Sequence, residues 1–156
     1  SRGLGMCIRD RYNWSDHECQ YSGKTKLVLA HKMYGFPFLD ISGECGISSR
    51  DNYVVLSEAL PNLEGGVDSL VDIQKYLSTK FALFVFGTTN YRMRYLERYA
   101  FEFIPDIRKI EGFSLKSLQC YKKIDNYIAD FFKFTEGERE IIELFSRDYL
   151  FNNVKG

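Results

Sequence analysis

The chain has 156 residues, of which 45% are hydrophobic and 16% aromatic, which suffices for a domain with a hydrophobic core and excludes an intrinsically disordered segment. Lysine and arginine number 21, as do aspartate and glutamate, so the formal net charge is zero. This balance excludes a protein that finds nucleic acid by long-range attraction alone. No apolar run reaches the roughly 18 residues of a membrane helix and no signal peptide opens the chain, so we expect a cytoplasmic protein without a membrane partner.

The first 23 residues are predicted to be a lead-in that is artefactual or disordered in part. The opening segment SRGLGMCIRDR resembles the adapter-derived translations at the ends of reading frames assembled from metagenomes. We therefore expect a fragment whose upstream part is missing, and we exclude about the first dozen residues from functional reasoning. Residues 24–156 are predicted to form a single domain.

The N-terminal half carries the strand signals. The apolar run KLVLA at Lys26–Ala30 predicts one strand, and the aromatic and β-branched run at Tyr53–Leu56 predicts another. Between them, Gly35 and Pro37 predict a turn over residues 31–40.

The hydrophobic period then changes to three and four residues. Apolar residues at this spacing predict one amphipathic helix over residues 69–86, with Asp68 or Ser69 as its N-cap and Gly87 as its end.

The last third of the chain is predicted to be helical. Apolar residues at helical spacing predict a short helix over residues 124–132. Thr135 and Glu138 have the spacing of a capping box and predict the start of a last helix that runs through Phe145. Short strands followed by helices predict the α+β class, with a small sheet in the N-terminal half packed with helices of the C-terminal half.

Aromatic residues and arginines alternate within Lys80–Arg108, KFALFVFGTTNYRMRYLERYAFEFIPDIR. A short helix or turn is predicted at Tyr91–Tyr99, and Ala100–Ile104 is predicted to be extended. Arginine offers a planar fork of donors to phosphate or a guanine edge, and tyrosine offers a stacking face. If Arg94 and Arg98 lie four apart on a helix, they share one face, as a phosphate clamp needs.

The same run has a second interpretation. Its phenylalanines are predicted to belong to the core, namely Phe81, Phe84, Phe86, Phe101 and Phe103. The tyrosine and arginines at positions 91, 92, 94 and 98 fit a core or a solvated face as well as they fit a nucleic-acid surface.

Motifs for chemistry are missing. Cys7, Cys19, Cys45 and Cys120 show no CxxC spacing, which favours reduced thiols, and together with His17 they match no common metal-ligand pattern. The prolines are isolated, so the Asn-Pro-Pro-aromatic loop of amino-group DNA methyltransferases is missing. Nuclease motifs of the PD-(D/E)xK and HNH types and glycine-rich nucleotide loops are missing too. We therefore predict no catalytic centre and no cofactor in this segment.

Three segments together resemble a known family: KLVLAHKMYGFPFLDISGECGISSRDNYVVL, YLSTKFALFVFGTTNYRMRYLERYAFEFIPDI and DFFKFTEGEREIIELF. In this order they resemble the C-terminal part of restriction-modification adenine DNA methyltransferases, including TaqI-like specificity domains and fused restriction enzymes. The resemblance implies that an upstream domain binds S-adenosylmethionine and carries the catalytic loop, while this part grips double-stranded DNA and reads the site. It also implies that Gly46–Tyr53 leads a strand near DNA and that Tyr91–Arg98 presents basic side chains to it.

The resemblance thus implies a target-recognition domain that serves a catalytic domain in cis. The predicted DNA-binding residues are His31, Lys32, Arg50, Asn52, Lys80, Asn90, Tyr91, Arg92, Arg94 and Arg98. The alternative is a protein-protein interaction module that docks a catalytic partner domain, because tyrosine and arginine are also enriched at protein interfaces.

Overall fold

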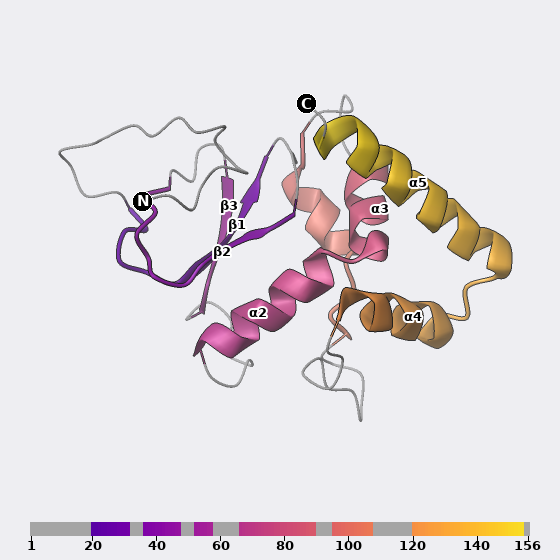
Figure 1. Cartoon of the computed structure of the whole chain (residues 1–156), viewed down its shortest axis with the longest axis horizontal. Helices are drawn as coiled ribbons and strands as arrows, with labels where there is room; N and C mark the ends of the chain where they lie inside the picture. Colours follow the sequence, from indigo (N-terminus) through magenta and orange to yellow (C-terminus); the bar gives the residue numbers. More distant parts are fainter. Residues whose placement is uncertain are drawn as a thin grey trace. The chain divides into compact units, whose positions relative to one another are not determined.

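Three short strands precede a series of helices in the computed structural model (Figure 1). The structure describes residues 20–31, 36–47, 52–57, 66–89, 95–107 and 120–154, without the side chains of residues 66–69 and 147–154. The elements are strands β1 (Lys26–Ala30), β2 (Phe38–Asp40) and β3 (Asn52–Leu56), helices α2 (Gly66–Leu77) and α3 (Lys80–Thr88), the 3-10 helix η2 (Arg98–Phe103), and helices α4 (Tyr121–Phe131) and α5 (Glu136–Val154). The predicted α+β class is confirmed.

The chain divides into two compact units, Ser1–Gln74 and Lys75–Gly156, and the boundary falls within α2. The first unit contains the sheet, and the second contains α3, η2, α4 and α5. The assignment of residues 24–156 to a single domain stays a prediction, and each unit is described by itself.

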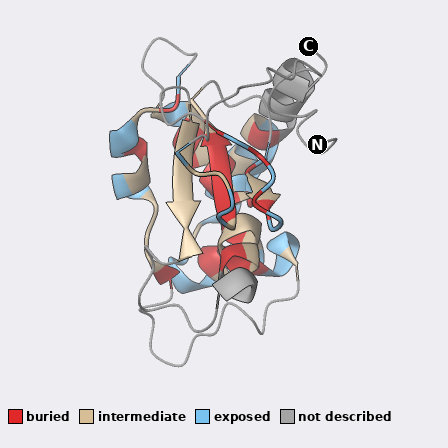
Figure 2. Cartoon of the chain, turned by 90° about the vertical axis from the view of Figure 1, so that its left-hand side faces the viewer, coloured by how far each residue is buried: buried red, intermediate tan, exposed pale blue. Residues whose placement is uncertain are grey.

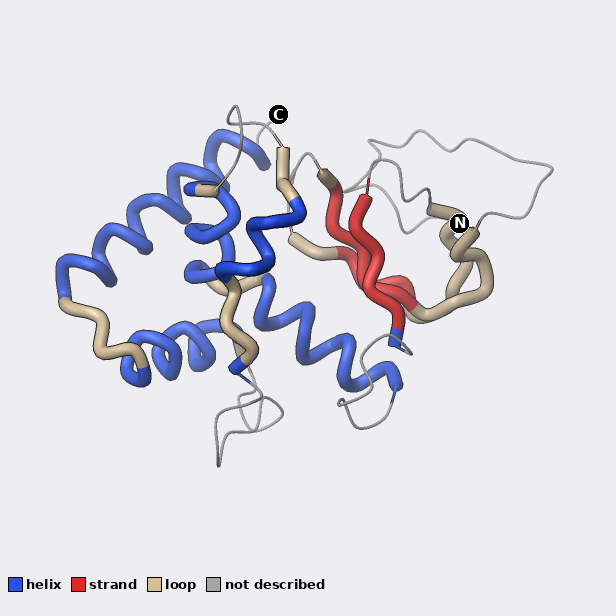
Figure 3. Tube along the Cα trace, turned by 180° about the vertical axis from the view of Figure 1, so that it is seen from behind, coloured by secondary structure: helices blue, strands red, loops and turns tan. Residues whose placement is uncertain are grey.

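In the first unit, β1 is the central strand of an antiparallel sheet with the order β2-β1-β3 (Figure 3). Residues 26–29 of β1 are buried, whereas all of β3 is half-buried (Figure 2). A short, continuous apolar run such as KLVLA is typical of a strand that is covered on both faces. The two predicted strands are confirmed.

The turn predicted over residues 31–40 is wrong for Phe38–Asp40, which form β2. Three residues are too few to show an alternating pattern, and β2 exists because it pairs with β1. A buried cluster joins side chains of all three strands and of the loop after β2, namely Val28, Cys45 and Ile47 with Phe38 and Val54 against them.

A buried ion pair joins β1 to β2. Lys26 and Asp40 lie directly opposite each other in the strand register, with their charged atoms 2.7 Å apart and side chains only 0% and 3% exposed. The ammonium of Lys26 also donates to the backbone carbonyls of Tyr21, at 3.0 Å, and Lys24, at 3.2 Å. The three donors of the ammonium therefore all have acceptors, which a buried charge requires.

Asp40 in turn holds the loop that follows β2. Its carboxylate accepts hydrogen bonds from the backbone N–H groups of Gly43, at 2.9 Å, and Cys45, at 3.1 Å. Burial by itself would raise the pKa of Asp40, but the hydrogen bonds from Lys26 and from these backbone groups outweigh burial and hold its pKa below the ordinary 3.8. The carboxylate is thus stabilised in its ionised form.

Gly43 allows two loops to meet at this end of the sheet. Its backbone has φ of 72°, and a Cβ built on it would lie 2.6 Å from the carbonyl carbon of Gly23. The N–H of Gly23 donates to the carbonyl of Gly43 at 2.9 Å. Only glycine fits this approach and this conformation.

The single helix predicted over residues 69–86 is wrong. Its residues belong to two helices, α2 and α3. Ser78 and Thr79 lie between them and interrupt the helix. Thr79 is fully buried and is the N-cap of α3, because its hydroxyl accepts a hydrogen bond from the N–H of Ala82 at 3.2 Å. The apolar period continues across the break and hides it from a pattern search.

The start of α2 was predicted too late. The helix begins at Gly66, so Asp68 and Ser69 lie inside it and are not its N-cap.

The first turn of α3 leaves no backbone N–H without an acceptor. The N–H of Thr79 donates to the carbonyl of Tyr76 at 3.2 Å, and the N–H of Leu83 makes the first intrahelical bond, to the carbonyl of Thr79 at 3.1 Å. The carboxylate of Asp125, on α4, accepts from Lys80 N at 2.9 Å and from Phe81 N at 3.0 Å. The N–H groups of residues 79–82 are the four donors that a helix N-terminus leaves without intrahelical partners.

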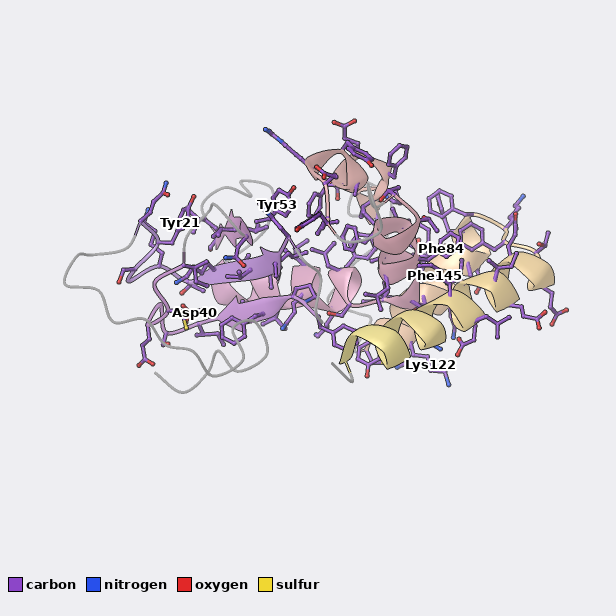
Figure 4. All side chains as sticks on the ribbon, turned by 90° about the horizontal axis from the view of Figure 1, so that it is seen from above. Tyr21, Asp40, Tyr53, Phe84, Lys122 and Phe145 are labelled. Carbon is purple, nitrogen blue, oxygen red and sulfur yellow. The ribbon has the colours of Figure 1, made fainter. Side chains whose placement is uncertain are left out.

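Gly87 does not end the helix as predicted, because α3 continues to Thr88. A Cβ at Gly87 would lie 2.2 Å from the ring of Phe145 on α5. The same ring contacts Phe84 edge-on, with ring centroids 5.4 Å apart (Figure 4). Gly87 therefore lets α5 approach α3 closely.

The predicted C-terminal helices are confirmed as α4 and α5, although α4 ends one residue before Phe132. The predicted capping box is present: Thr135 N donates to the carboxylate of Glu138 at 2.7 Å, and Glu138 N donates to the Thr135 hydroxyl at 3.3 Å. A buried cluster of Tyr76, Ile107, Ile124 and Ile128 holds α4 in the second unit.

Replacing Asp40 by asparagine should destabilise the protein, because it leaves the buried ammonium of Lys26 without a counter-charge. We expect Asp40→Asn to lower the free energy of unfolding by about 3–5 kcal/mol near pH 7, measured by urea titration. Asp130→Asn is the control, since its partner Arg139 forms an exposed ion pair with it, and should change stability by less than about 1 kcal/mol.

The effect of Asp40 should also depend on pH. Because its folded-state pKa is lowered, the carboxylate stabilises the fold fully above the unfolded-state value of 3.8, and this contribution is lost as the pH falls through that value towards the folded-state pKa. The parent protein should therefore lose more stability than Asp40→Asn between about pH 5 and about pH 3. Equal losses in the two proteins would contradict this role of Asp40.

Thr79→Ala should destabilise the second unit by about 1–2 kcal/mol in a thermal or urea unfolding experiment, because it removes the N-cap of α3. Thr88→Ala is the matched control at the other end of the same helix. Thr88 is exposed and donates to carbonyls of its own helix, those of Phe84 at 2.7 Å and Val85 at 3.3 Å, so its loss should change stability by at most about 0.5 kcal/mol. Comparable losses of stability in both variants would show that Thr79 does not stabilise α3 as its N-cap.

Candidate nucleic-acid interface

The aromatic and basic run forms a 3-10 helix in its second part. The prediction of an extended segment at Ala100–Ile104 is wrong, because η2 continues to Phe103 and only Ile104 is extended. The alternating sequence AFEFI resembles a strand, but Phe101 packs against Phe86 of α3, with ring centroids 5.3 Å apart, whereas Phe103 faces solvent. The contact of Phe101 with α3 therefore favours the 3-10 helix over an extended segment.

The segment is fixed in place on both sides of η2. Leu96, Ala100 and Ile107 are at most 1% exposed. After η2, the carbonyl of Pro105 accepts a hydrogen bond of 2.6 Å from the buried hydroxyl of Tyr76. Burial raises the pKa of Tyr76, so this hydroxyl keeps its proton and remains a donor.

Between these anchors, aromatic side chains and one arginine reach the surface. Tyr95 and Tyr99 are each 43% exposed, Phe103 is 60% exposed, and Arg98 is exposed. The core prediction is confirmed for Phe86 and is wrong for Phe103. Tyr99 and Phe103 were not predicted to be surface groups.

Arg98 keeps its charge available. It forms no ion pair with another described residue, although Glu97 and Glu102 are its neighbours along the chain. Tyr95–Glu97 are not helical, so the predicted helix or turn at Tyr91–Tyr99 is not helical over these three residues, and Arg94 lies outside the described residues.

Lys80 lies at the first position of α3, where its side chain forms an ion pair with Glu143 of α5. Its backbone N–H is bound to Asp125. Burial raises the pKa of Asp125, an effect that the hydrogen bonds from the backbone of Phe81 and Lys80 reduce. Lys80 is thus engaged within the second unit, and a phosphate would have to compete with Glu143 for it.

In the first unit, two predicted residues come together at one end of the sheet. Asn52, at the start of β3, lies opposite Ala30, the residue before His31. The ring of His31 contacts the ring of Tyr53, with centroids 4.3 Å apart and planes tilted by 50° (Figure 4 labels Tyr53). Tyr53, which was predicted only as part of a strand, therefore adds an aromatic side chain to this pair.

The remaining predicted site residues lie outside the described part of the chain. They are Lys32, Arg50, Asn90, Tyr91, Arg92 and Arg94. Their assignments stay predictions.

The described cysteines, Cys45 and Cys120, are free thiols. Cys45 is buried, and burial followed by the negative charge of Asp40 raises its pKa, which makes it a poor nucleophile. Among the described residues, no group of histidine, cysteine and acidic side chains gathers that could hold a metal ion. Within the same ranges, no helix combines the length and apolar character needed to cross a membrane.

Comparison with protein-family models, with curated proteins and with solved structures finds no match for this chain.

Proposed function

We propose that the chain binds double-stranded DNA as the target-recognition part of a restriction-modification adenine methyltransferase. In this proposal a catalytic domain, upstream in the same polypeptide, binds S-adenosylmethionine and transfers the methyl group in the cytoplasm. The resemblance of three ordered segments supports the proposal, and so does the lack of a catalytic motif in the chain. Whether the whole protein also cleaves DNA depends on that upstream part.

The observation that carries the proposal is the surface of η2. Arg98 is exposed without an ion-pair partner among the described residues, and exposed aromatic rings flank it along the chain. Arginine binds phosphate and guanine, and aromatic rings stack on bases, so this combination suits nucleic acid. Arg92 and Arg94 precede it in the sequence and extend the same basic run.

The end of the sheet in the first unit supplies a second group of suitable side chains. His31, Asn52 and Tyr53 can offer hydrogen bonds and a stacking surface, and asparagine pairs well with the edge of adenine. Lys32 and Arg50 flank them in the sequence. We propose that these residues contact bases.

A protein-docking function is the second candidate, and a specific surface favours it. The rings of Tyr127, Phe131, Phe132 and Phe134 follow one another at the end of α4, with centroid separations of 6.3, 5.1 and 6.1 Å. Phe131 and Phe132 are 49% and 42% exposed. Acidic residues follow on α5, namely Glu136, Glu138, Glu140 and Glu143, which disfavours DNA on this side and suits a protein such as the catalytic domain.

The DNA proposal predicts salt-dependent duplex binding. In a filter-binding titration at about 50 mM salt, Arg98→Ala should weaken binding about 5- to 10-fold, because a charged hydrogen bond to phosphate or base is removed. Arg94→Ala with Arg98→Ala should weaken it further and should flatten the slope of log affinity against log salt by about 1 for each phosphate that no longer has an arginine partner.

Lys122→Ala is the control for this experiment. Lys122 is an exposed basic residue on α4, and in Figure 4 it lies on the opposite side of the second unit from η2. Its removal should leave the affinity within about twofold of the parent. If the double arginine variant bound duplex DNA like the parent, the arginine surface would be reassigned to a protein partner.

A further inference from the structure

Helix α5 packs against α3 with one of its faces (Figure 1). The ring of Phe145 contacts Phe84 edge-on and lies where a Cβ at Gly87 would be. The next residue, Ser146, is only 1% exposed. These contacts fix the rotation of α5 about its own axis, so the face opposite Phe145 and Ser146 is directed to solvent.

The solvent face of α5 carries a row of apolar residues. Ile141 and Leu144 are 57% and 44% exposed, and a Cβ at Gly137 would meet no atom within 4 Å. The spacings of four and three residues place Gly137, Ile141 and Leu144 on one side of the helix. Single exposed apolar side chains are normal, but a row with this spacing is the pattern by which one helix packs along another.

Acidic residues lie on both sides of the row. A helix rotates by about 100° per residue, so Glu138 lies on one side of the row and Glu140 on the other, and both are exposed. No ion pair joins Glu140 to another described residue. Arg139 is the one basic residue in the sequence of residues 136–146, and it is bound to Asp130. In paired helices these flanking positions select the partner by charge.

We infer that the solvent face of α5 docks a basic amphipathic helix of a partner protein. The apolar side chains of that helix cover Gly137, Ile141 and Leu144, and its lysines or arginines lie opposite Glu138 and Glu140. A second copy of α5 is disfavoured, because its glutamates would meet the same glutamates. The inference goes beyond DNA binding and rests on the protein-docking candidate, to which it gives a partner of defined chemistry.

The probe for the test is a synthetic peptide of about 21 residues, which has leucine at the two apolar positions of each heptad and lysine at the flanking positions. It is labelled with fluorescein and titrated with the whole chain at about 50 mM salt, where surface charges are little screened, and its fluorescence anisotropy should rise to saturation. Two control peptides should bind at least about tenfold more weakly. One has glutamate in place of lysine, and the other has the composition of the probe with its leucines out of register.

Variants of the chain locate the binding face. Ile141→Ala with Leu144→Ala should weaken binding of the probe about tenfold, because the row loses its apolar surface. Ile41→Ala is the matched control in the first unit, since Ile41 is 56% exposed, and should change the affinity less than about twofold. Glu140→Lys should weaken binding about three- to fivefold at low salt and less at high salt. Glu102→Lys, at an exposed glutamate of η2, is its control.

Gly137→Leu gives a test that does not depend on a loss. The position has room for a side chain, and leucine favours a helix more than glycine does. A leucine here lengthens the apolar row, so binding of the probe should become at least about threefold tighter. Melting temperatures of the alanine variants should match the parent, because Ile141 and Leu144 are exposed. If they fall, the result for Gly137→Leu decides.

Equal binding of the probe and the out-of-register peptide would overturn the inference, and so would parent-like affinity in a folded Ile141→Ala, Leu144→Ala variant or no tightening in Gly137→Leu. Dimers of the parent in analytical ultracentrifugation that the double alanine variant abolishes would assign the face to a second copy and overturn it too. None of these results touches duplex binding through Arg98, and the rings at the end of α4 would remain a separate candidate for protein docking.

Discussion

The N-terminus of α3 is the constraint on which the second unit depends. Thr79 starts a new helix two residues after α2 ends, and Asp125 of α4 completes the capping of its first turn. In a continuous helix each residue is rotated by a fixed angle from the last, so a break is what resets the direction of the following side chains. With this start, Phe86 meets Phe101 of η2 and Phe84 meets Phe145 of α5. Phe103 of η2 is left exposed by these contacts, because α3 buries Phe101 and cannot also bury Phe103.

Burial decides how much each ion pair contributes. Lys26 and Asp40 are excluded from water and satisfy each other together with backbone groups of two loops. Arg139 and Asp130 have the same chemistry and the same kind of contact, but both are exposed, and water competes for each charge. The first pair therefore holds two loops at the end of the sheet, whereas the second contributes little to the local structure. A buried charge network is also specific, because a shifted strand register would leave both charges without partners.

The two units carry different polar and aromatic groups on their surfaces. The second presents Arg98, Glu102 and exposed aromatic rings on η2, and exposed glutamates on α5. The first brings His31, Asn52 and Tyr53 to one end of a sheet whose opposite end is closed by the Lys26–Asp40 pair.

The sequence by itself determined the elements whose signals are local. The apolar run of β1, the aromatic and β-branched residues of β3, and the capping box of Thr135 and Glu138 each lie within a few residues, and all three were predicted. Four features depended on partners distant in the sequence, namely the pairing of β2, the break at Thr79, the close approach at Gly87, and the outward direction of Phe103. Periodicity cannot show which of two apolar residues will meet a neighbour, because both satisfy the same pattern. Only packing against α3 separates Phe101 from Phe103 and turns one of them into a surface group.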